Sequence, residues 1–220
     1  MTTQSSQPFP RSWNPRSSAT RVIPSTVWAA GTTPIDPGDR WPTPVVSRAV
    51  TEFSGPGDRV LLLGWPEPTT RSPLTVLPSD TTDALAVVEG VDRAGHIAAG
   101  PPGPEHAELI LASLLVADLD AVAAADRVVE LASAQLAEGG LLVVLSRCGH
   151  SETGVLTDPV GAVVTAAQAA DLLYLQHIIA APLHGTTVST GEPGPGPARH
   201  SVAHTDLLVF LRPESAPTQP

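Results

Sequence analysis

The residues best placed to bind a ligand follow a short apolar stretch in the first third of the chain. Residues 60–63 are all apolar; a Pro-Gly-Asp turn precedes them and Gly64 follows. An apolar run of this length, bounded by turn residues, is typical of a buried parallel strand covered on both faces. In a doubly wound sheet, ligands bind beyond the carboxyl end of such a strand. The stretch from Gly64 to Thr70, which includes Trp65 and Thr69, is therefore the first candidate binding loop.

Two other pairs of reactive residues are weaker candidates. Cys148 and His150 follow a predicted strand, but a thiol nucleophile needs a base within reach, and a spacing of two in a loop does not supply one. His200 and His204 have a metal-binding spacing for a helix, yet a strand is predicted there and no third ligand is evident. We therefore expect no metal site. The sequence also lacks a Gly-x-Ser-x-Gly elbow and a Gly-x-x-x-x-Gly-Lys phosphate loop.

Composition narrows the class of protein. The 220 residues suit one domain, and the net charge of -10 argues against a broad surface for nucleic acid or anionic membrane. No apolar run approaches the ~20 residues of a membrane helix, and no basic-then-apolar leader begins the chain. A single cysteine fits a reducing compartment. We expect a cytoplasmic protein with no membrane contact.

The order of predicted elements indicates an α/β fold. Helical spacing or capping residues predict helices over 45–53, 81–89, 120–137 and 158–170. Apolar runs predict strands over 60–63, 96–99, 108–113, 141–145, 172–180 and 202–211, and 22–28 is either a short strand or an arm across the core. No helix separates the last two strands. The pattern predicts a three-layer, doubly wound, mostly parallel sheet ending in an antiparallel hairpin.

The connection after residue 64 is unusual. The next apolar run, 74–77, follows too soon for an ordinary parallel crossover, and Pro66, Pro68 and Pro73 oppose a helix. Either the crossover is abbreviated, so that the helix after the first strand is short or absent, or residues 74–77 are not a neighbouring parallel strand. Asp80 lies at the start of the helix that follows. It either stabilises that helix end or binds a ribose hydroxyl.

Three segments are expected along the chain. Residues 1–20 are rich in Ser, Thr, Gln and Pro and are predicted to be a disordered tail. Residues 21–212 form the α/β domain, and residues 213–220 a flexible C-terminal tail.

Several segments together resemble the S-adenosylmethionine-dependent amino-methyltransferases that modify DNA. Trp41-Pro42-Thr43-Pro44 and Pro56-Gly57-Asp58-Arg59-Val60-Leu61 are similar to the family's His-Pro-x-x-x-Pro helix and Pro-Gly-Asp-x-Val-Leu-Asp-Pro strand. Leu136 to Val144, with its Gly-Gly, is like the family's Leu-x-Pro-Gly-Gly-x-Leu-Val-Val turn and strand, and His204 to Phe210 is similar to its last strand. The resemblance covers residues 27–212 and implies a methyltransferase-type Rossmann-like fold.

The resemblance also implies site residues and a cofactor. Gly64, Trp65, Thr69, Thr70 and Asp80 would contact S-adenosylmethionine, and Ser113 would stand where the family's catalytic Asp/Asn/Ser-Pro-Pro-aromatic motif begins. The chain departs from that pattern at the positions that carry chemistry. Leu63 replaces the acidic residue, Gly64 is the only glycine of the loop, and neither proline nor an aromatic residue follows Ser113. Without the aromatic residue, the platform that holds a flipped base is lost.

Two functions follow from these observations. The first is a methyltransferase-like protein with a degenerate active site, with DNA as the partner implied by the resemblance and acidic charge opposing strong DNA binding. The second is a non-enzymatic regulatory or protein-interaction module that retains the fold.

Overall fold

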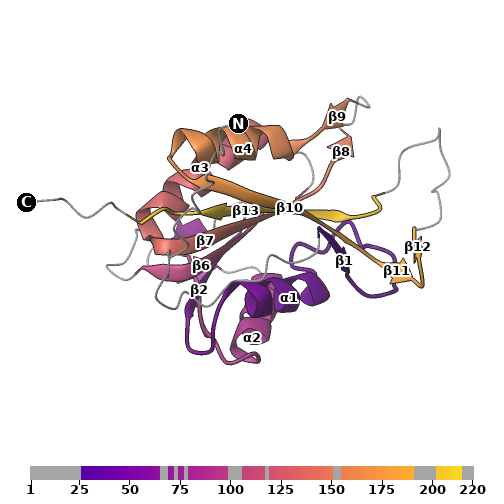
Figure 1. Ribbon diagram of the computed structural model, residues 1–220, viewed down its shortest axis with the longest axis horizontal. Coiled ribbons are helices and arrows are strands. Elements are labelled where there is room, and N and C mark those ends of the chain that lie inside the picture. The colour runs from indigo at the N-terminus through magenta and orange to yellow at the C-terminus, as the bar shows by residue number, and fades with distance from the viewer. Residues whose placement is uncertain are drawn as a thin grey trace, which may run out of the picture.

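The computed structural model describes residues 26–64, 69–71, 74–76, 79–98, 106–116, 119–150, 155–190 and 202–214. A seven-stranded sheet forms its centre (Figure 1). In spatial order its strands are β1 (Val27–Ala29), β10 (Leu173–Ala181), β13 (Thr205–Leu211), β7 (Leu136–Ser146), β6 (Ala107–Ser113), β2 (Arg59–Gly64) and β5 (Ala94–Ile97).

One strand runs against all the others. The pairs β1–β10, β6–β7, β2–β6 and β2–β5 are parallel, whereas β13 is antiparallel to both β10 and β7. The predicted hairpin is confirmed, with Leu173 opposite Leu211 and Ala180 opposite Thr205. The last strand lies inside the sheet, between β7 and β10. A mostly parallel sheet with a reversed final strand in this position is the methyltransferase-type Rossmann-like fold, as predicted.

Helices cover both faces of the sheet. Figure 1 shows α1 (Thr43–Phe53) and α2 (Ser79–Glu89) on one face, and α3 (Ala121–Gln135) and α4 (Pro159–Ala169) on the other. Because successive strand residues point to opposite faces, each apolar run supplies two cores. Leu62 and Leu111 are buried toward α1 and α2, whereas Ile110 and Leu142 are buried toward α3 and α4. This two-sided burial explains why the strands read as continuous apolar runs rather than alternating ones.

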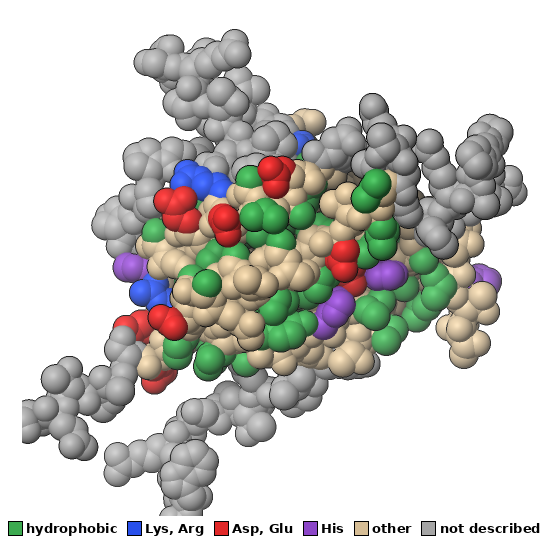
Figure 2. All heavy atoms as spheres, turned by 90° about the horizontal axis from the view of Figure 1, so that it is seen from above, with side chains coloured by type: hydrophobic (Ala, Val, Ile, Leu, Met, Phe, Trp, Pro, Cys, Tyr) green, Lys and Arg blue, Asp and Glu red, His purple; other side chains and the backbone are tan. Residues whose placement is uncertain are grey.

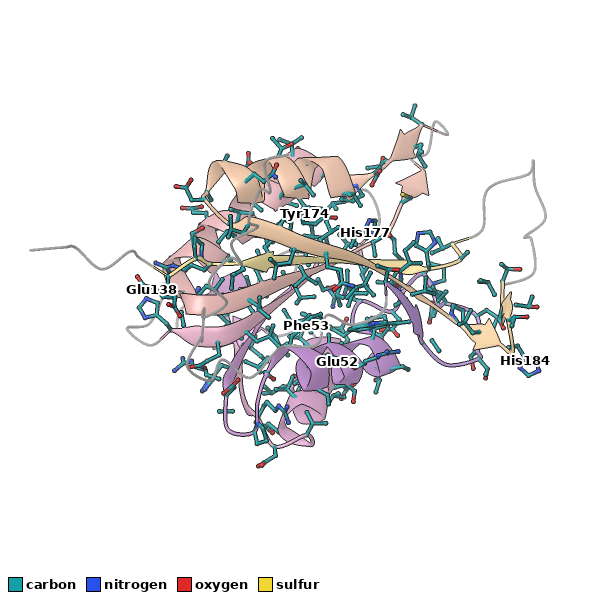
Figure 3. All side chains as sticks on the ribbon, viewed as in Figure 1. Glu52, Phe53, Glu138, Tyr174, His177 and His184 are labelled. Carbon is teal, nitrogen blue, oxygen red and sulfur yellow. The ribbon has the colours of Figure 1, made fainter. Side chains whose placement is uncertain are left out.

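Aromatic packing fixes α1 against the edge strand β1. Phe53 points from α1 toward the sheet (Figure 3) and stacks on Trp28 of β1, with ring centroids 5.9 Å apart. The Arg48 guanidinium lies over the Trp28 ring at 4.4 Å from its centroid. The segment predicted as either a short strand or an arm is therefore a strand at residues 27–29, held by α1 and paired with β10.

Helices α3 and α4 begin at the predicted capping residues, but α3 ends before its predicted last residue. The Asp120 and Asp158 carboxylates accept hydrogen bonds from the backbone N–H groups of Ala123 and Val160, which begins α3 and α4 as predicted. The helix predicted over 120–137 ends earlier, at Gln135, because Leu136 already pairs with Ala107 in the sheet.

A small hairpin lies in the connection between β2 and α2. Strands β3 (Thr69–Arg71) and β4 (Leu74–Val76) pair antiparallel with each other, so the described part of the predicted 74–77 run is not a neighbouring strand of the main sheet. The crossover helix is α2, which leads into β5 beside β2. Of the two alternatives for this connection, the second is therefore confirmed; the described residues between Gly64 and Leu74 form strand β3 and no helix, and the helix predicted over 81–89 is also confirmed.

Two small hairpins complete the described structure. They join β8 (Gly149–His150) to β9 (Leu156–Thr157), and β11 (Leu183–His184) to β12 (Thr187–Val188). Within the described residues, no helix has the length and apolar character needed to cross a membrane. The predicted tail 1–20 and most of 213–220 lie outside the described residues.

The packing makes a direct prediction about stability. Leu142→Ala removes a fully buried side chain between the sheet and α3 and α4, so the free energy of unfolding should fall by about 2–5 kcal/mol. Val122→Ala on α3 is the matched control, because Val122 is 63% exposed and should change stability by less than about 0.5 kcal/mol. Urea unfolding measures both. Equal losses in the two variants would contradict this assignment of the core.

Candidate functional site

The candidate site lies at the carboxyl ends of β2 and β6. The helix after β2 packs on one face of the sheet and the helix after β6 packs on the other, so the chain reverses its winding between these strands. Ligands of doubly wound sheets bind at this point. Gly64 ends β2, Ser113 ends β6, and the two residues pair directly in register. The structure therefore brings two of the predicted site residues side by side.

Ser113 is used within the protein. The residue is 2% exposed, and its hydroxyl donates a hydrogen bond of 2.5 Å to the backbone carbonyl oxygen of Arg40. The same hydroxyl oxygen lies 3.4 Å from the backbone N–H of Leu115, which donates to it. Arg40 belongs to the segment that precedes α1, so this segment crosses the end of β6.

The next residue of that segment, Trp41, covers the end of β2. Trp41 is 4% exposed, and its indole Nε1 donates to the Thr81 hydroxyl at 3.2 Å. A Cβ atom placed on Gly64 would lie 3.7 Å from the Thr81 hydroxyl and 3.9 Å from Cζ2 of Trp41. These are ordinary van der Waals distances, so the Thr81 hydroxyl and the Trp41 ring lie next to Gly64 on the side where a Cβ atom would point.

Asp80 joins the same cluster from the first turn of α2. Its two carboxylate oxygens accept from Nε and Nη2 of Arg40, both at 2.6 Å. Oδ1 also accepts from the backbone N–H of Thr81 at 2.8 Å. A bidentate arginine–carboxylate pair is geometrically specific. With both oxygens engaged, Asp80 holds the segment before α1 and has little capacity left for a ribose hydroxyl.

A second arginine holds the other end of this segment. Nη1 of Arg147, just after β7, donates to the carbonyl oxygens of Asp36 and Asp39, each at 3.2 Å, and Nε donates to the Thr205 hydroxyl. Burial lowers the pKa of the Arg147 guanidinium, and the negative charges of Asp39 and Asp36 oppose that shift. We refer to residues 36–41 as the plug segment. Arg147 and the Arg40–Asp80 pair fasten it across the carboxyl edge of the sheet.

The structure describes two of the other three predicted cofactor residues, both in the β3–β4 hairpin. Thr69 and Thr70 lie in β3, opposite Val76 and Thr75. Trp65 lies outside the described residues. The sequence reasoning missed the roles of Arg40 and Trp41, because the proline-rich stretch that contains them gives no periodic signal.

The described residues give no support to either of the two weaker candidate pairs as a catalytic or metal site. Burial raises the pKa of the Cys148 thiol, as do the charges of Asp158 and Asp206 and a hydrogen bond to Asp158, so the reactive thiolate is disfavoured. His200 lies outside the described residues, and His204 instead lies 3.4 Å from the Asp206 carboxylate. The described part of the chain contains no group of three side chains able to hold a metal ion.

Comparison with known proteins gives similarity of fold only. No family model and no curated protein matches the sequence. Similar solved structures include the [4+2]-cyclase SpnF, which is 14% identical with a TM-score of 0.47 over 85% of this chain and 88% of SpnF. The N-methyltransferase NodS from Bradyrhizobium japonicum, in complex with S-adenosyl-L-homocysteine, is 14% identical with a TM-score of 0.45 over 77% of this chain and 85% of NodS. A candidate DNA modification methylase from Thermus thermophilus is 12% identical with a TM-score of 0.35, and the match covers 79% of this chain and 53% of the methylase.

The fastening of the plug segment can be tested directly. Arg40→Ala removes the bidentate pair with Asp80, so amide hydrogen exchange over residues 36–41 should become faster. Because both side chains are partly exposed, the loss in unfolding free energy should be only about 0.5–1 kcal/mol. Arg127→Ala is the matched control, since it removes an exposed ion pair with Glu130 on α3. Unchanged exchange over 36–41 in Arg40→Ala would show that the pair does not hold the segment.

Proposed function

We propose that this protein is a non-catalytic binding module built on the methyltransferase fold, with its cofactor crevice closed by the plug segment. The observation that carries the proposal is the occupation of the β2 and β6 ends. The Arg40 carbonyl engages the Ser113 hydroxyl, and the Trp41 indole lies in front of Gly64. A cofactor at this edge would have to displace both.

The free energy needed to displace Trp41 determines how weakly S-adenosylmethionine would bind. Removing a buried tryptophan from its packing site costs about 3–5 kcal/mol in proteins generally. If opening the crevice requires a comparable free energy, the apparent affinity falls by the equilibrium constant for opening, which is roughly 10²–10⁴. An S-adenosylmethionine site with an intrinsic Kd of about 1 μM would then bind with an apparent Kd of roughly 0.1–10 mM. Leu63 and the single glycine of the loop weaken the intrinsic site further, because the acidic residue and the close backbone approach are both missing.

A second candidate is residual S-adenosylmethionine-dependent methyl transfer to DNA. It is supported by the family resemblance and by the position of Ser113, at the carboxyl end of β6 beside Gly64. In this alternative the plug segment opens, and Ser113 exchanges the Arg40 carbonyl for the target amine. The net charge of -10 and the lack of an aromatic residue after Ser113 weigh against it.

Calorimetric titration with S-adenosylmethionine separates the two candidates. We expect no binding heat, because the crevice is filled, and no transfer of a labelled methyl group to DNA. Tryptophan fluorescence during the same titration, with Trp65→Phe as the control for the predicted loop, should stay constant. Binding at micromolar strength, about -8 kcal/mol, would overturn the non-catalytic proposal. Methyl transfer to DNA would establish the second candidate.

A further inference from the structure

Within the described residues, one face of the sheet is not covered beyond α4. Ser146, Asp206, Ile179 and Val27 form a row across β7, β13, β10 and β1, each paired in register with the next. This row lies on the face that α3 and α4 cover. Leu208 and Phe210, two and four residues after Asp206 on the same strand, are buried against these helices, and residues two apart on a strand point to the same face. Exposure rises along the row from 0% and 3% for Ser146 and Asp206 to 37% and 52% for Ile179 and Val27. Helix α4 therefore leaves the outer strands uncovered.

This open face has a polar centre and an apolar edge. Two histidines lie close to Oδ1 of the buried Asp206. Nε2 of His177, on β10, is 2.8 Å from this oxygen, and Nε2 of His204 is 3.4 Å from it. Tyr174 and His177 lie along β10 on the side that faces α4 (Figure 3). Seen from above, histidine and acidic side chains are surrounded by hydrophobic ones (Figure 2). We define the open face as Val27, His177, Ile179 and His204 around Asp206.

The electrostatic environment of the open face is negative. The pKa of the Cys148 thiol is raised first by burial and then by the charges of Asp158 and Asp206. The pKa of the Tyr174 hydroxyl is raised by burial and by the charge of Asp206. The Cys148 thiol, in the connection between β7 and β8, and the Tyr174 hydroxyl, on β10, thus both sense the Asp206 carboxylate. A positively charged segment with apolar side chains would complement both the charge and the exposed aliphatic groups.

The N-terminal 25 residues have that chemistry. They contain Arg11, Arg16 and Arg21, the aromatic residues Phe9 and Trp13, and none of the chain's 22 acidic residues. They also end at the open face, because the carbonyl oxygen of Thr26 accepts from the backbone N–H of Ile179 at 2.8 Å. Trp13 lies thirteen positions before Thr26, and a relaxed chain of that length spans roughly 20 Å, enough to reach any part of the face.

We propose that residues 9–21 dock on the open face of their own chain, with Phe9 and Trp13 against Val27 and Ile179 and the arginines in the negative field of Asp158 and Asp206. The docking needs no regular secondary structure in the arm. It is held by apolar contact and by charge attraction, and the second contribution is screened by salt.

The single cysteine allows a test in the full-length protein. Cys148 is exposed and lies beside Asp158, so its thiol can carry a dye that tryptophan quenches on contact. Docking would bring Trp13 to the dye, and Trp13→Phe should therefore raise the emission several-fold, with the other three tryptophans unchanged. Salt at about 1 M, where the Debye length is about 3 Å, should raise the wild-type emission as well.

Two variants and a dilution series complete the test. Ile179→Asp should abolish the Trp13-dependent quenching by placing a charge in the apolar contact, and simultaneous replacement of the three arm arginines by glutamate should do the same. Arg127→Glu on α3 is the matched control and should leave the quenching unchanged. Emission that is identical in wild type and Trp13→Phe would overturn the proposal. Quenching that disappears on dilution would also overturn it, because the arm would then belong to a second copy.

Discussion

The structure at the carboxyl edge of the sheet depends on how the ends of β2 and β6 are covered. Two parallel strands that end side by side leave polar groups and a hollow between diverging helices, and in doubly wound folds a ligand commonly fills it. Here Arg40 and Trp41, in the plug segment, lie against these strand ends. The Arg40–Asp80 pair, the Trp41–Thr81 hydrogen bond and the Ser113–Arg40 hydrogen bond link this segment to α2 and β6.

This arrangement uses the same features that would otherwise serve a cofactor. The N-terminus of α2 approaches the crevice, and its first turn carries Asp80 and Thr81. Both side chains are engaged by the plug segment, so the helix end that could favour a bound ligand instead anchors Arg40 and Trp41. Arg147 adds a third attachment through the backbone of Asp36 and Asp39. If the proposed function holds, closure of the crevice and loss of catalysis have one physical cause, namely that Arg40 and Trp41 engage the groups a cofactor would need.

The sequence predicts the sheet well because its signals are local. Apolar runs such as 109–112 and 141–145 must be buried on both faces, and the absence of a helix between the last two strands requires them to be antiparallel. Capping aspartates 120 and 158 locate two helix starts for the same reason. The β3–β4 hairpin was missed because three-residue strands carry almost no periodicity.

The plug segment could not be predicted in this way because its contacts are not local. Arg40 and Asp80 are forty positions apart, as are Trp41 and Thr81, and neither pair has a spacing that indicates contact. The resemblance to amino-methyltransferases located Gly64, Ser113 and Asp80 along the chain. It could not reveal that other side chains engage them, since that depends on the path of a proline-rich segment between β1 and α1.

A crystal structure determined in the presence of excess S-adenosylhomocysteine tests the closure most directly. We expect no ligand at the ends of β2 and β6, with the Trp41 indole within hydrogen-bonding distance of Thr81 and the Arg40 carbonyl oxygen accepting from the Ser113 hydroxyl. A nucleoside bound in front of Gly64, with Trp41 displaced from the crevice, would contradict it.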